Sequence, residues 1–283
     1  DINGNGLKEI FVTGISRSSI KSFVLEYQGG KFVKTADLPW CLRVISRDDE
    51  PILLGQQFGT DSVFNTPIYE IVWRNGKYEE GKRMKIPLGL SIYGLTIDEL
   101  ISGSSPKVIA LDEYDHLVVF EQTEKPLDKL RVFGGSTEFL YKTDDVFGGC
   151  NTSFEISDHD IGADREKMTA SINLRILTYD LNKDGKKEII IVKNISAAGR
   201  MMKSVNLFTS SEVYNLEWDG LGLYENWRTR KIDGYVADYQ VKDIDNDGQH
   251  EIVMALVTSS GVSLTGRSIV VYFKFNLPQP ATR

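Results

Sequence analysis

The chain has 283 residues, and its 33 Lys and Arg against 40 Asp and Glu give a formal net charge of −7. This acidic balance disfavours nucleic acids and anionic membranes as partners. No apolar run reaches the length of a transmembrane helix, so we expect no direct insertion into a membrane. The hydrophobic content of 41% is ordinary for a globular protein with a buried core.

The first nine residues carry oxygen-bearing side chains at alternate positions, with a glycine at position 6 of the loop. Glycine tolerates the positive φ that a sharp turn needs at this point. We expect the side chains at positions 1, 3, 5 and 9, and the main-chain carbonyl at position 7, to converge on one cation. In this loop those residues are Asp1, Asn3, Asn5, Leu7 and Glu9. Hard oxygen ligands with net negative charge suit Ca²⁺ better than a transition metal.

Short strands are predicted after this loop, at residues 10–13, 22–27 and 32–34, with a Gly-Gly hairpin signal between the last two. A second unit repeats this order, with strands at 42–45, 52–54, 68–73 and from 78 onward. Its acidic segment at 48–51 is too short for a cation loop and lacks glycine. Aromatic residues flank the hairpin turns of three units in a matching register, in the pairs Tyr27 and Phe32, Trp73 and Tyr78, and Trp218 and Tyr224.

A third unit begins near residue 98, where residues 98–105 form another degenerate loop. Strands are expected at 107–111 and 117–120, with 131–133 as a candidate fourth strand. The next unit starts about 30 residues later than the repeat length requires, and we assign this excess to an insertion at 137–169. Residues 164–170 fit a short helix. Surplus loops on a repeat scaffold often carry function, so the insertion is either a partner contact or a structural flap over one blade.

The nine-residue pattern returns twice, each time with the same glycine and the same trailing Glu-Ile. The second loop places Asp180, Asn182, Asp184, Lys186 and Glu188 at the five ligand positions. The third places Asp243, Asp245, Asp247, Gln249 and Glu251 there. One such loop alone fits a polar turn equally well, but three copies favour cation sites. Formal ligand charge rises from −2 through −3 to −4 along the chain, so we predict the weakest calcium binding at the Asp1 loop and the strongest at the Asp243 loop.

Predicted strands, rather than helices, flank these loops, which distinguishes them from EF-hand loops. Nine-residue calcium loops between strands resemble those of the FG-GAP/VCBS repeat family, which includes integrin-like β-propellers. The resemblance implies an all-β fold, a single β-propeller domain over residues 1–283 with about five four-stranded blades and calcium loops between first and second strands. Units start near residues 1, 48, 98, 180 and 243. The first and last units are expected to be incomplete, with an upstream portion of the same precursor completing the propeller.

The sequence contains no familiar catalytic motif such as Gly-Xaa-Ser-Xaa-Gly or His-Glu-Xaa-Xaa-His. Together with the resemblance, this favours a non-enzymatic binding or adhesion scaffold that is stabilised by up to three Ca²⁺ ions and takes a protein or glycan ligand. Loops of modest charge fill at extracellular calcium levels, so we expect the periplasm or the cell surface. Two alternatives stay open: an enzyme or enzyme-associated propeller acting on carbohydrate, and a structural spacer in a larger surface protein.

The histidines and cysteines do not distinguish among these functions. His159 lies between two acids in the insertion, a pattern typical of an exposed acidic loop. Cys41 and Cys150 allow one disulfide, but two unpaired small core residues fit the sequence equally well.

Overall fold

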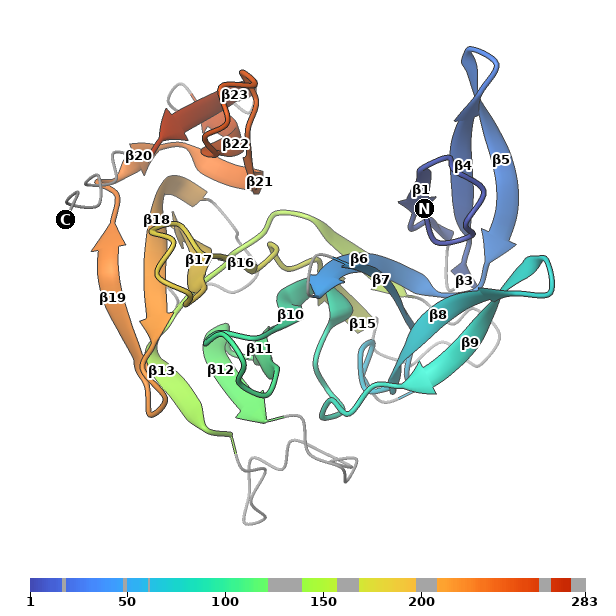
Figure 1. The fold of residues 1–283 in the computed structure, drawn as a ribbon, viewed down its shortest axis with the longest axis horizontal. Coiled ribbons are helices and arrows are strands. Elements are labelled where there is room, and N and C mark those ends of the chain that lie inside the picture. Colours follow the sequence, from blue (N-terminus) through green and yellow to red (C-terminus); the bar gives the residue numbers. More distant parts are fainter. Residues whose placement is uncertain are drawn as a thin grey trace.

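The computed structural model describes residues 1–16, 19–47, 50–60, 62–121, 139–156, 168–196, 208–259 and 266–275. Within these residues the chain forms antiparallel sheets and one 3₁₀ turn, η1 (Ile92–Gly94), and no α-helix. Five sheets follow one another along the chain and are arranged around a common centre as the blades of a β-propeller (Figure 1). The predicted all-β propeller fold is confirmed.

Each blade is a meander in which most strands pair with the next strand of the sequence. Blade 1 contains β1 (Glu9–Val12), β4 (Ser22–Gln28) and β5 (Lys31–Leu38). Blade 2 contains β6 (Cys41–Arg47), β7 (Glu50–Gln56), β8 (Ile68–Arg74) and β9 (Lys77–Arg83). Blade 3 contains β10 (Leu95–Asp98), β11 (Lys107–Leu111), β12 (His116–Glu121) and β13 (Tyr141–Val146). Blade 4 contains β16 (Leu177–Tyr179), β17 (Glu188–Ser196), β18 (Phe208–Trp218) and β19 (Leu223–Arg228), with β20 (Ile232–Asp233) paired to β18. Blade 5 contains β21 (Tyr235–Lys242), β22 (Glu251–Ser259) and β23 (Gly266–Lys274).

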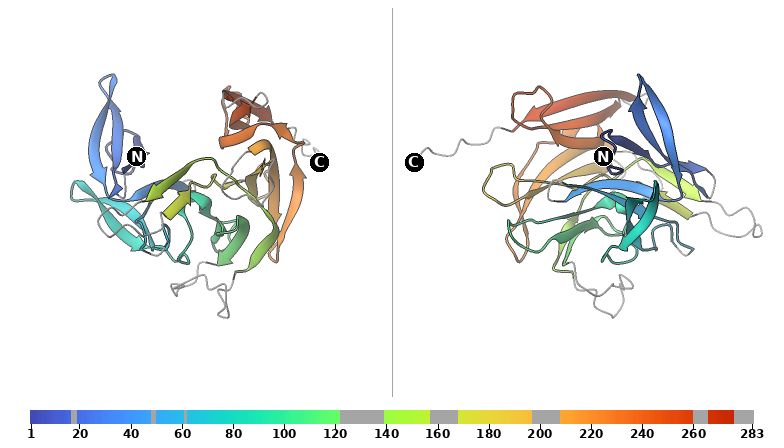
Figure 2. Two further views of the ribbon diagram at one scale, coloured as in Figure 1. Left: turned by 180° about the vertical axis from the view of Figure 1, so that it is seen from behind. Right: turned by 45° about the vertical axis from the view of Figure 1, so that its right-hand side comes forward.

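The acidic loops show which strands blades 1 and 5 lack. The second and third loops precede β17 and β22, the second strands of their blades, and the first loop precedes β1 in the same way. Among the described residues, blade 1 therefore has no counterpart of a first strand, and blade 5 has none of a fourth. Within the part of the chain that the structure describes, the predicted incomplete first and last units are confirmed. Blades 1 and 5 flank the open side of the arc in Figure 1 and in the left view of Figure 2.

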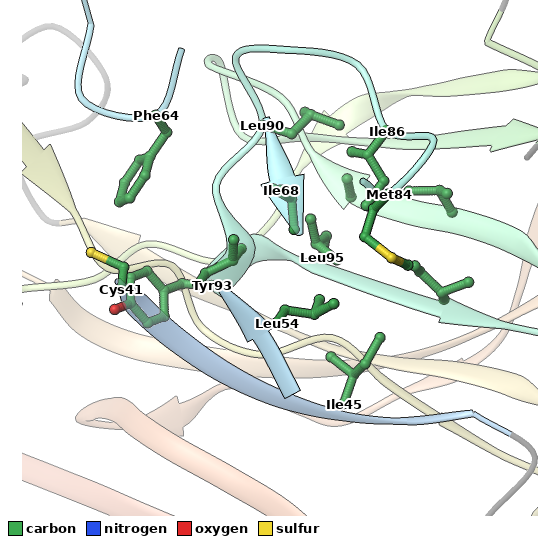
Figure 3. Close-up of a cluster of buried hydrophobic side chains, with 14 of the residues drawn as sticks. Cys41, Ile45, Leu54, Phe64, Ile68, Met84, Ile86, Leu90, Tyr93 and Leu95 are labelled. Carbon is green, nitrogen blue, oxygen red and sulfur yellow. The ribbon is translucent and has the colours of Figure 1, made fainter. Parts of the chain in front are cut away.

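Neighbouring blades bury one hydrophobic cluster at each of their four interfaces. Strand β17 shows how one strand serves two interfaces. Ile189 and Ile191 belong to the cluster shared with blade 3, whereas Ile190 and Val192 belong to the cluster shared with blade 5. Because successive side chains of a strand point to opposite faces, a strand buried on both faces reads as a continuous apolar run. Figure 3 shows the cluster between blades 2 and 3, in which Leu54 lies near Leu95 and Cys41 lies beside Tyr93.

Two of the three predicted aromatic pairs face each other as expected. Tyr27 pairs with Phe32, with ring centroids 5.2 Å apart, and Trp73 pairs with Tyr78, with centroids 4.8 Å apart. The third pair was wrong by one residue, because Trp218 pairs with Leu223. A β-bulge between Asn215 and Leu216 accompanies this altered hairpin.

The boundaries of the predicted insertion were wrong. Strand β13 lies inside 137–169 and supplies the fourth strand of blade 3, whereas the candidate strand at 131–133 lies outside the described residues. Residues 168–170 belong to strand β15 (Met168–Ser171) instead of the predicted helix, and 164–167, like His159, lie outside the described residues. Strand β15 pairs with β14 (Ser153–Ile156), so cross-strand hydrogen bonding replaces local helical bonding there.

The described part of this segment packs on the propeller. The ring of Phe154 stacks on Phe58 with centroids 5.5 Å apart, and Ile156 and Ala170 belong to the cluster between blades 2 and 3. The β14–β15 hairpin is therefore a structural flap over that interface. A second small pair, β2 (Ile15–Ser16) with β3 (Ser19–Ile20), lies between β1 and β4 in the chain.

Candidate metal centres

The three acidic loops share one pattern of internal hydrogen bonds. The carboxylate at position 1 accepts from the backbone N–H at position 5, at 3.1 to 3.2 Å, and from the N–H at position 6, at 2.8 to 3.0 Å. The side-chain oxygen at position 3 accepts from the same position-5 N–H, and the oxygen at position 5 accepts from the N–H at position 7. These bonds aim the side chains of positions 1, 3 and 5 into one concave turn.

Glycine is needed at position 6 because the backbone there is left-handed. Gly6, Gly185 and Gly248 have φ of +86°, +89° and +85°. A residue with a Cβ is strained in this region, so the recurrence of glycine at position 6 of all three loops has a conformational cause. Position 4 is left-handed too, and there Lys183 and Asn246 accept positive φ without being glycine.

The glutamate at position 9 comes from the strand that follows each loop and turns back under it. Its carboxylate accepts the backbone N–H of position 2 at 2.8 to 3.1 Å in all three loops. Glu188 and Glu251 are buried, and the Glu9 side chain is 1% exposed. Burying a carboxylate is costly unless it is hydrogen-bonded, paired or bound to a metal.

One residue of the strand opposite each position-9 glutamate completes the loops, and the sequence analysis missed all three. Glu26 lies opposite Glu9, and Lys274 lies opposite Glu251. Glu217 lies one rung beyond the Ile189–Leu216 pair, opposite Glu188. The signal available in the sequence was the residue before an aromatic at or next to the end of each strand, in Glu26-Tyr27, Glu217-Trp218 and Lys274-Phe275.

The first two loops hold a buried glutamate at this opposite position. Glu26 accepts hydrogen bonds from the amide Nδ2 atoms of Asn3, at 2.7 Å, and of Asn5. In the second loop, Glu217 accepts from the Nζ of Lys186 at 2.8 Å. The Asn side chains and Lys186, chosen from the sequence as ligand positions, therefore also bind this additional acid.

The third loop holds the tightest group of acids. Carboxylate oxygens of Asp243, Asp245 and Asp247 all lie within 4.8 Å of one another. The Nζ of Lys274 lies 2.8 Å from Asp245 Oδ2 and 2.5 Å from Asp247 Oδ2. Oε1 of Glu251 is buried and has no hydrogen-bond partner among the described residues.

Electrostatics differ among the loops. Burial raises the pKa of Glu188 above its usual value, and the acids at positions 1 and 5 act in the same direction. Burial also acts to raise the pKa of Glu9, but backbone hydrogen bonds from positions 2 and 3 outweigh it and hold the pKa below its usual value. In the third loop the hydrogen bond from Lys274 lowers the pKa of Asp247.

These residues fit a calcium ion. Each loop gathers four oxygen-bearing side chains, and a position-7 carbonyl is present in every case. Oxygen-only ligands with excess negative charge are the donors that Ca²⁺ takes, whereas Zn²⁺ and Cu²⁺ prefer nitrogen and sulfur. The orphaned Oε1 of Glu251 is an acceptor that a cation in the third loop would satisfy.

Neighbouring blades hold the loops in place. The backbone N–H of Ser102, in the degenerate loop of blade 3, donates to the carbonyl of Gly185 at 3.0 Å. The Nζ of Lys187 donates to buried Asp98 at 2.7 Å. His250, at position 8 of the third loop, bonds through Nδ1 to the hydroxyl of Tyr179 at 3.0 Å, so it contacts blade 4.

A second polar group lies where the inner strands meet. The guanidinium of Arg175 donates to Asp238 of β21 through Nε at 2.6 Å and Nη2 at 2.5 Å. Arg43 of β6 lies close enough to interact electrostatically with both, and its buried Nε has no hydrogen-bond partner among the described residues. Tyr239 donates through its hydroxyl to the carbonyl of Arg175. Nearby, Tyr93 of η1 donates to Thr13 at 3.1 Å.

Comparison with known proteins identifies no family for this chain. No protein-family model matches the chain, and no curated protein matches it. One solved structure, a Bacteroides fragilis protein described as a candidate 6-phosphogluconolactonase, covers 98% of this chain and 84% of its own, with 11% identity and a TM-score of 0.36. That likeness is too low to support a conclusion.

The arrangement of sheets defines the class: a five-bladed β-propeller. Three of its blades carry a nine-residue acidic loop directly before β1, β17 or β22. The residue opposite the final glutamate of the loop is an acid in two of these blades and a lysine in the third. No helix of the described residues is long and apolar enough to cross a membrane.

Proposed function

We propose that this chain is a calcium-stabilised scaffold of the FG-GAP/VCBS type, which acts outside the cytoplasm, in the periplasm or at the cell surface, and binds a protein or glycan ligand without catalysis. The observation that carries the proposal is the threefold recurrence of one hydrogen-bonded loop at one place in the blade. A polar turn does not need a glutamate buried beneath it, and each of these loops has one.

Calcium would act on stability in this account. Each loop brings several carboxylates together, and these repel one another unless a cation neutralises them. A divalent ion that binds the folded loop and not the unfolded chain adds its binding free energy to folding. Sites of this charge fill at extracellular rather than resting cytosolic calcium, which supports the proposed location.

Isothermal titration of EDTA-treated protein with CaCl₂ tests the proposal. We expect up to three equivalents, and we expect Asp180→Asn to remove one, because Asp180 supplies the position-1 carboxylate of the second loop. Asp37→Asn is the matched control, since Asp37 is an exposed acid on β5 outside the loops. No heat of binding, or an unchanged stoichiometry in Asp180→Asn, would contradict the proposal.

A second candidate function rests on the polar group at the inner strands. Arg43, Arg175 and Asp238 come from different blades, and the unpartnered Nε of Arg43 is a donor suited to a carboxylate. The Asp238 side chain is 48% exposed, so solvent reaches the Asp238 end of this group. This observation favours an acidic carbohydrate as ligand or substrate, as an enzyme or enzyme-associated propeller would need.

Saturation-transfer NMR with glucuronate, with glucose as the neutral comparison, tests this candidate. It predicts transfer to glucuronate alone and loss of that transfer in Arg43→Gln. Equal signals for the two sugars, or an Arg43→Gln variant indistinguishable from the parent, would rule out the central group as an anion site. The third function, a structural spacer, is favoured if the saturation-transfer experiment shows no ligand binding while calcium still binds.

A further inference from the structure

We infer that Lys274 is a built-in counter-cation of the third loop, which competes with calcium and makes this loop a weaker calcium site than its own four acids imply. The inference rests on the proposed calcium function, and it concerns how that function is distributed among the loops. It differs from the order of affinity expected from ligand charge alone, in which the third loop is the strongest site.

The position of the ammonium group carries the inference. Nζ of Lys274 lies 2.8 Å from Asp245 Oδ2, 2.5 Å from Asp247 Oδ2 and 3.9 Å from Glu251 Oε1. These oxygens belong to loop positions 3, 5 and 9, so the ammonium lies among the ligands that a divalent ion would take. Two cations at this separation repel strongly, so calcium can enter only when the lysine side chain leaves.

Strand pairing fixes the lysine there. Lys274 is the residue directly opposite Glu251 in the β22–β23 ladder. The corresponding residues of the other loops are Glu26 and Glu217, both buried acids. The same structural position therefore adds a negative charge to loops 1 and 2 and a positive charge to loop 3. Including this residue, the formal charge of the third loop changes from −4 to −3. In the second loop the charge of Glu217 is paired with that of Lys186 at 2.8 Å, so the formal charge there stays at −3. The two loops then differ in where the cation lies, because Lys186 pairs with Glu217 whereas Lys274 lies among the ligand oxygens.

An independent observation shows that the lysine does not fully replace a metal ion. Glu251 is fully buried, and its Oε1 has no hydrogen-bond partner among the described residues. The Nζ of Lys274 is 3.9 Å from this oxygen, which exceeds hydrogen-bond distance. The lysine side chain is 44% exposed, so it can swing into solvent. The third loop thus retains an acceptor for calcium and a displaceable competitor.

Removal of the lysine tests the inference. We would titrate CaCl₂ into the ¹⁵N-labelled chain and follow the backbone amide signals of Gly6, Gly185 and Gly248, each of which donates to the position-1 carboxylate of its own loop. The test variant is Lys274→Met, with Lys274→Gln as a second variant if methionine disturbs the strand. Lys77→Met is the control, because it removes a lysine from an exposed hairpin outside the loops, where Lys77 pairs with Glu79.

We expect Gly248 to respond at higher calcium than Gly185 in the parent chain. In Lys274→Met, the calcium midpoint of Gly248 should fall at least about tenfold, since affinity follows the charge of the ligand set. The Gly185 midpoint should stay unchanged, and Lys77→Met should leave both midpoints unchanged. If Gly185 responds to calcium but Gly248 has the same midpoint with and without the lysine, the inference fails alone. If no loop glycine responds in any variant, the proposed calcium function fails with it.

Discussion

The hydroxyl of Tyr78 donates a hydrogen bond of 3.0 Å to Oε1 of Glu9 and so joins the outer hairpin of blade 2 to the acidic loop of blade 1. Both side chains are buried, and the ring of Tyr78 also meets Phe11 edge-on, with centroids 5.7 Å apart. The bond explains why the first loop, which has the fewest charged ligands, is still held in the same shape as the other two.

Replacing Tyr78 by phenylalanine should therefore destabilise the chain. The substitution keeps the ring but leaves a buried carboxylate with one hydrogen bond fewer, which costs about 1.5 to 3 kcal/mol for a bond to a charged group. Urea unfolding in EDTA measures the change. The control is Tyr27→Phe, whose exposed ring should change the free energy of unfolding by less than about 0.5 kcal/mol. Equal effects of the two substitutions would contradict this role of the Tyr78 hydroxyl.

Blades 4 and 5 are joined by the buried amide of Asn194. Its Nδ2 donates to the carbonyls of Gly149, at 2.8 Å, and Val236, at 2.9 Å, while its Oδ1 accepts from Ser211 and from the Val236 N–H. Asn194→Asp would place a carboxylate against two carbonyl oxygens in a buried site and should cost about 3 kcal/mol or more at pH 7. Asn151→Asp is the control, because Asn151 is exposed. A loss below about 1 kcal/mol in urea unfolding would show that this network is not important for stability.

Local sequence was sufficient to predict most of this fold. The hairpins at Gly29-Gly30 and Asn75-Gly76 were predicted because Gly-Gly and Asn-Gly are typical of turns with left-handed backbone. Both residues of each pair have positive φ. Strand β13 was missed because its sequence, Tyr-Lys-Thr-Asp-Asp-Val, has little apolar alternation. Its position depends on pairing with β12, a contact between segments distant in the chain.

The same reason explains what was missed at the site. The loop residues are close in sequence, so spacing alone located them. Glu26, Glu217 and Lys274 reach the loops only through strand register, and Arg43 meets Arg175 and Asp238 only because inner strands of several blades converge. Residues such as these, which reach a loop from another strand, are recognised when corresponding positions of the blades are compared, but not from the sequence of a single blade.

Cys41 should be inert in the folded chain. It is buried in the cluster between blades 2 and 3, and burial raises the pKa of its thiol to about 11. Because the thiolate is the reactive form, native Cys41 should react with iodoacetamide at pH 8 at least about a hundredfold more slowly than in 6 M guanidinium. Mass spectrometry of peptic peptides follows the reaction site by site. Equal native and denatured rates at Cys41 would show that this interface is open to solvent.

Cys41 and Cys150 are not joined by a disulfide, so both peptides should be alkylated after denaturation.

Thermal unfolding in excess EDTA, followed by stepwise return of calcium, tests the central claim most directly, with magnesium at the same concentrations as the comparison. We expect calcium to raise the melting temperature by roughly 5 to 10 °C for each site that is filled at a hundredfold excess over its Kd. Magnesium should have a much smaller effect, because it dehydrates reluctantly and demands a stricter octahedral geometry. No rise with either ion would mean that the three loops are polar turns and that calcium does not stabilise this propeller. An equal rise with both ions would contradict a calcium-specific role of the loops.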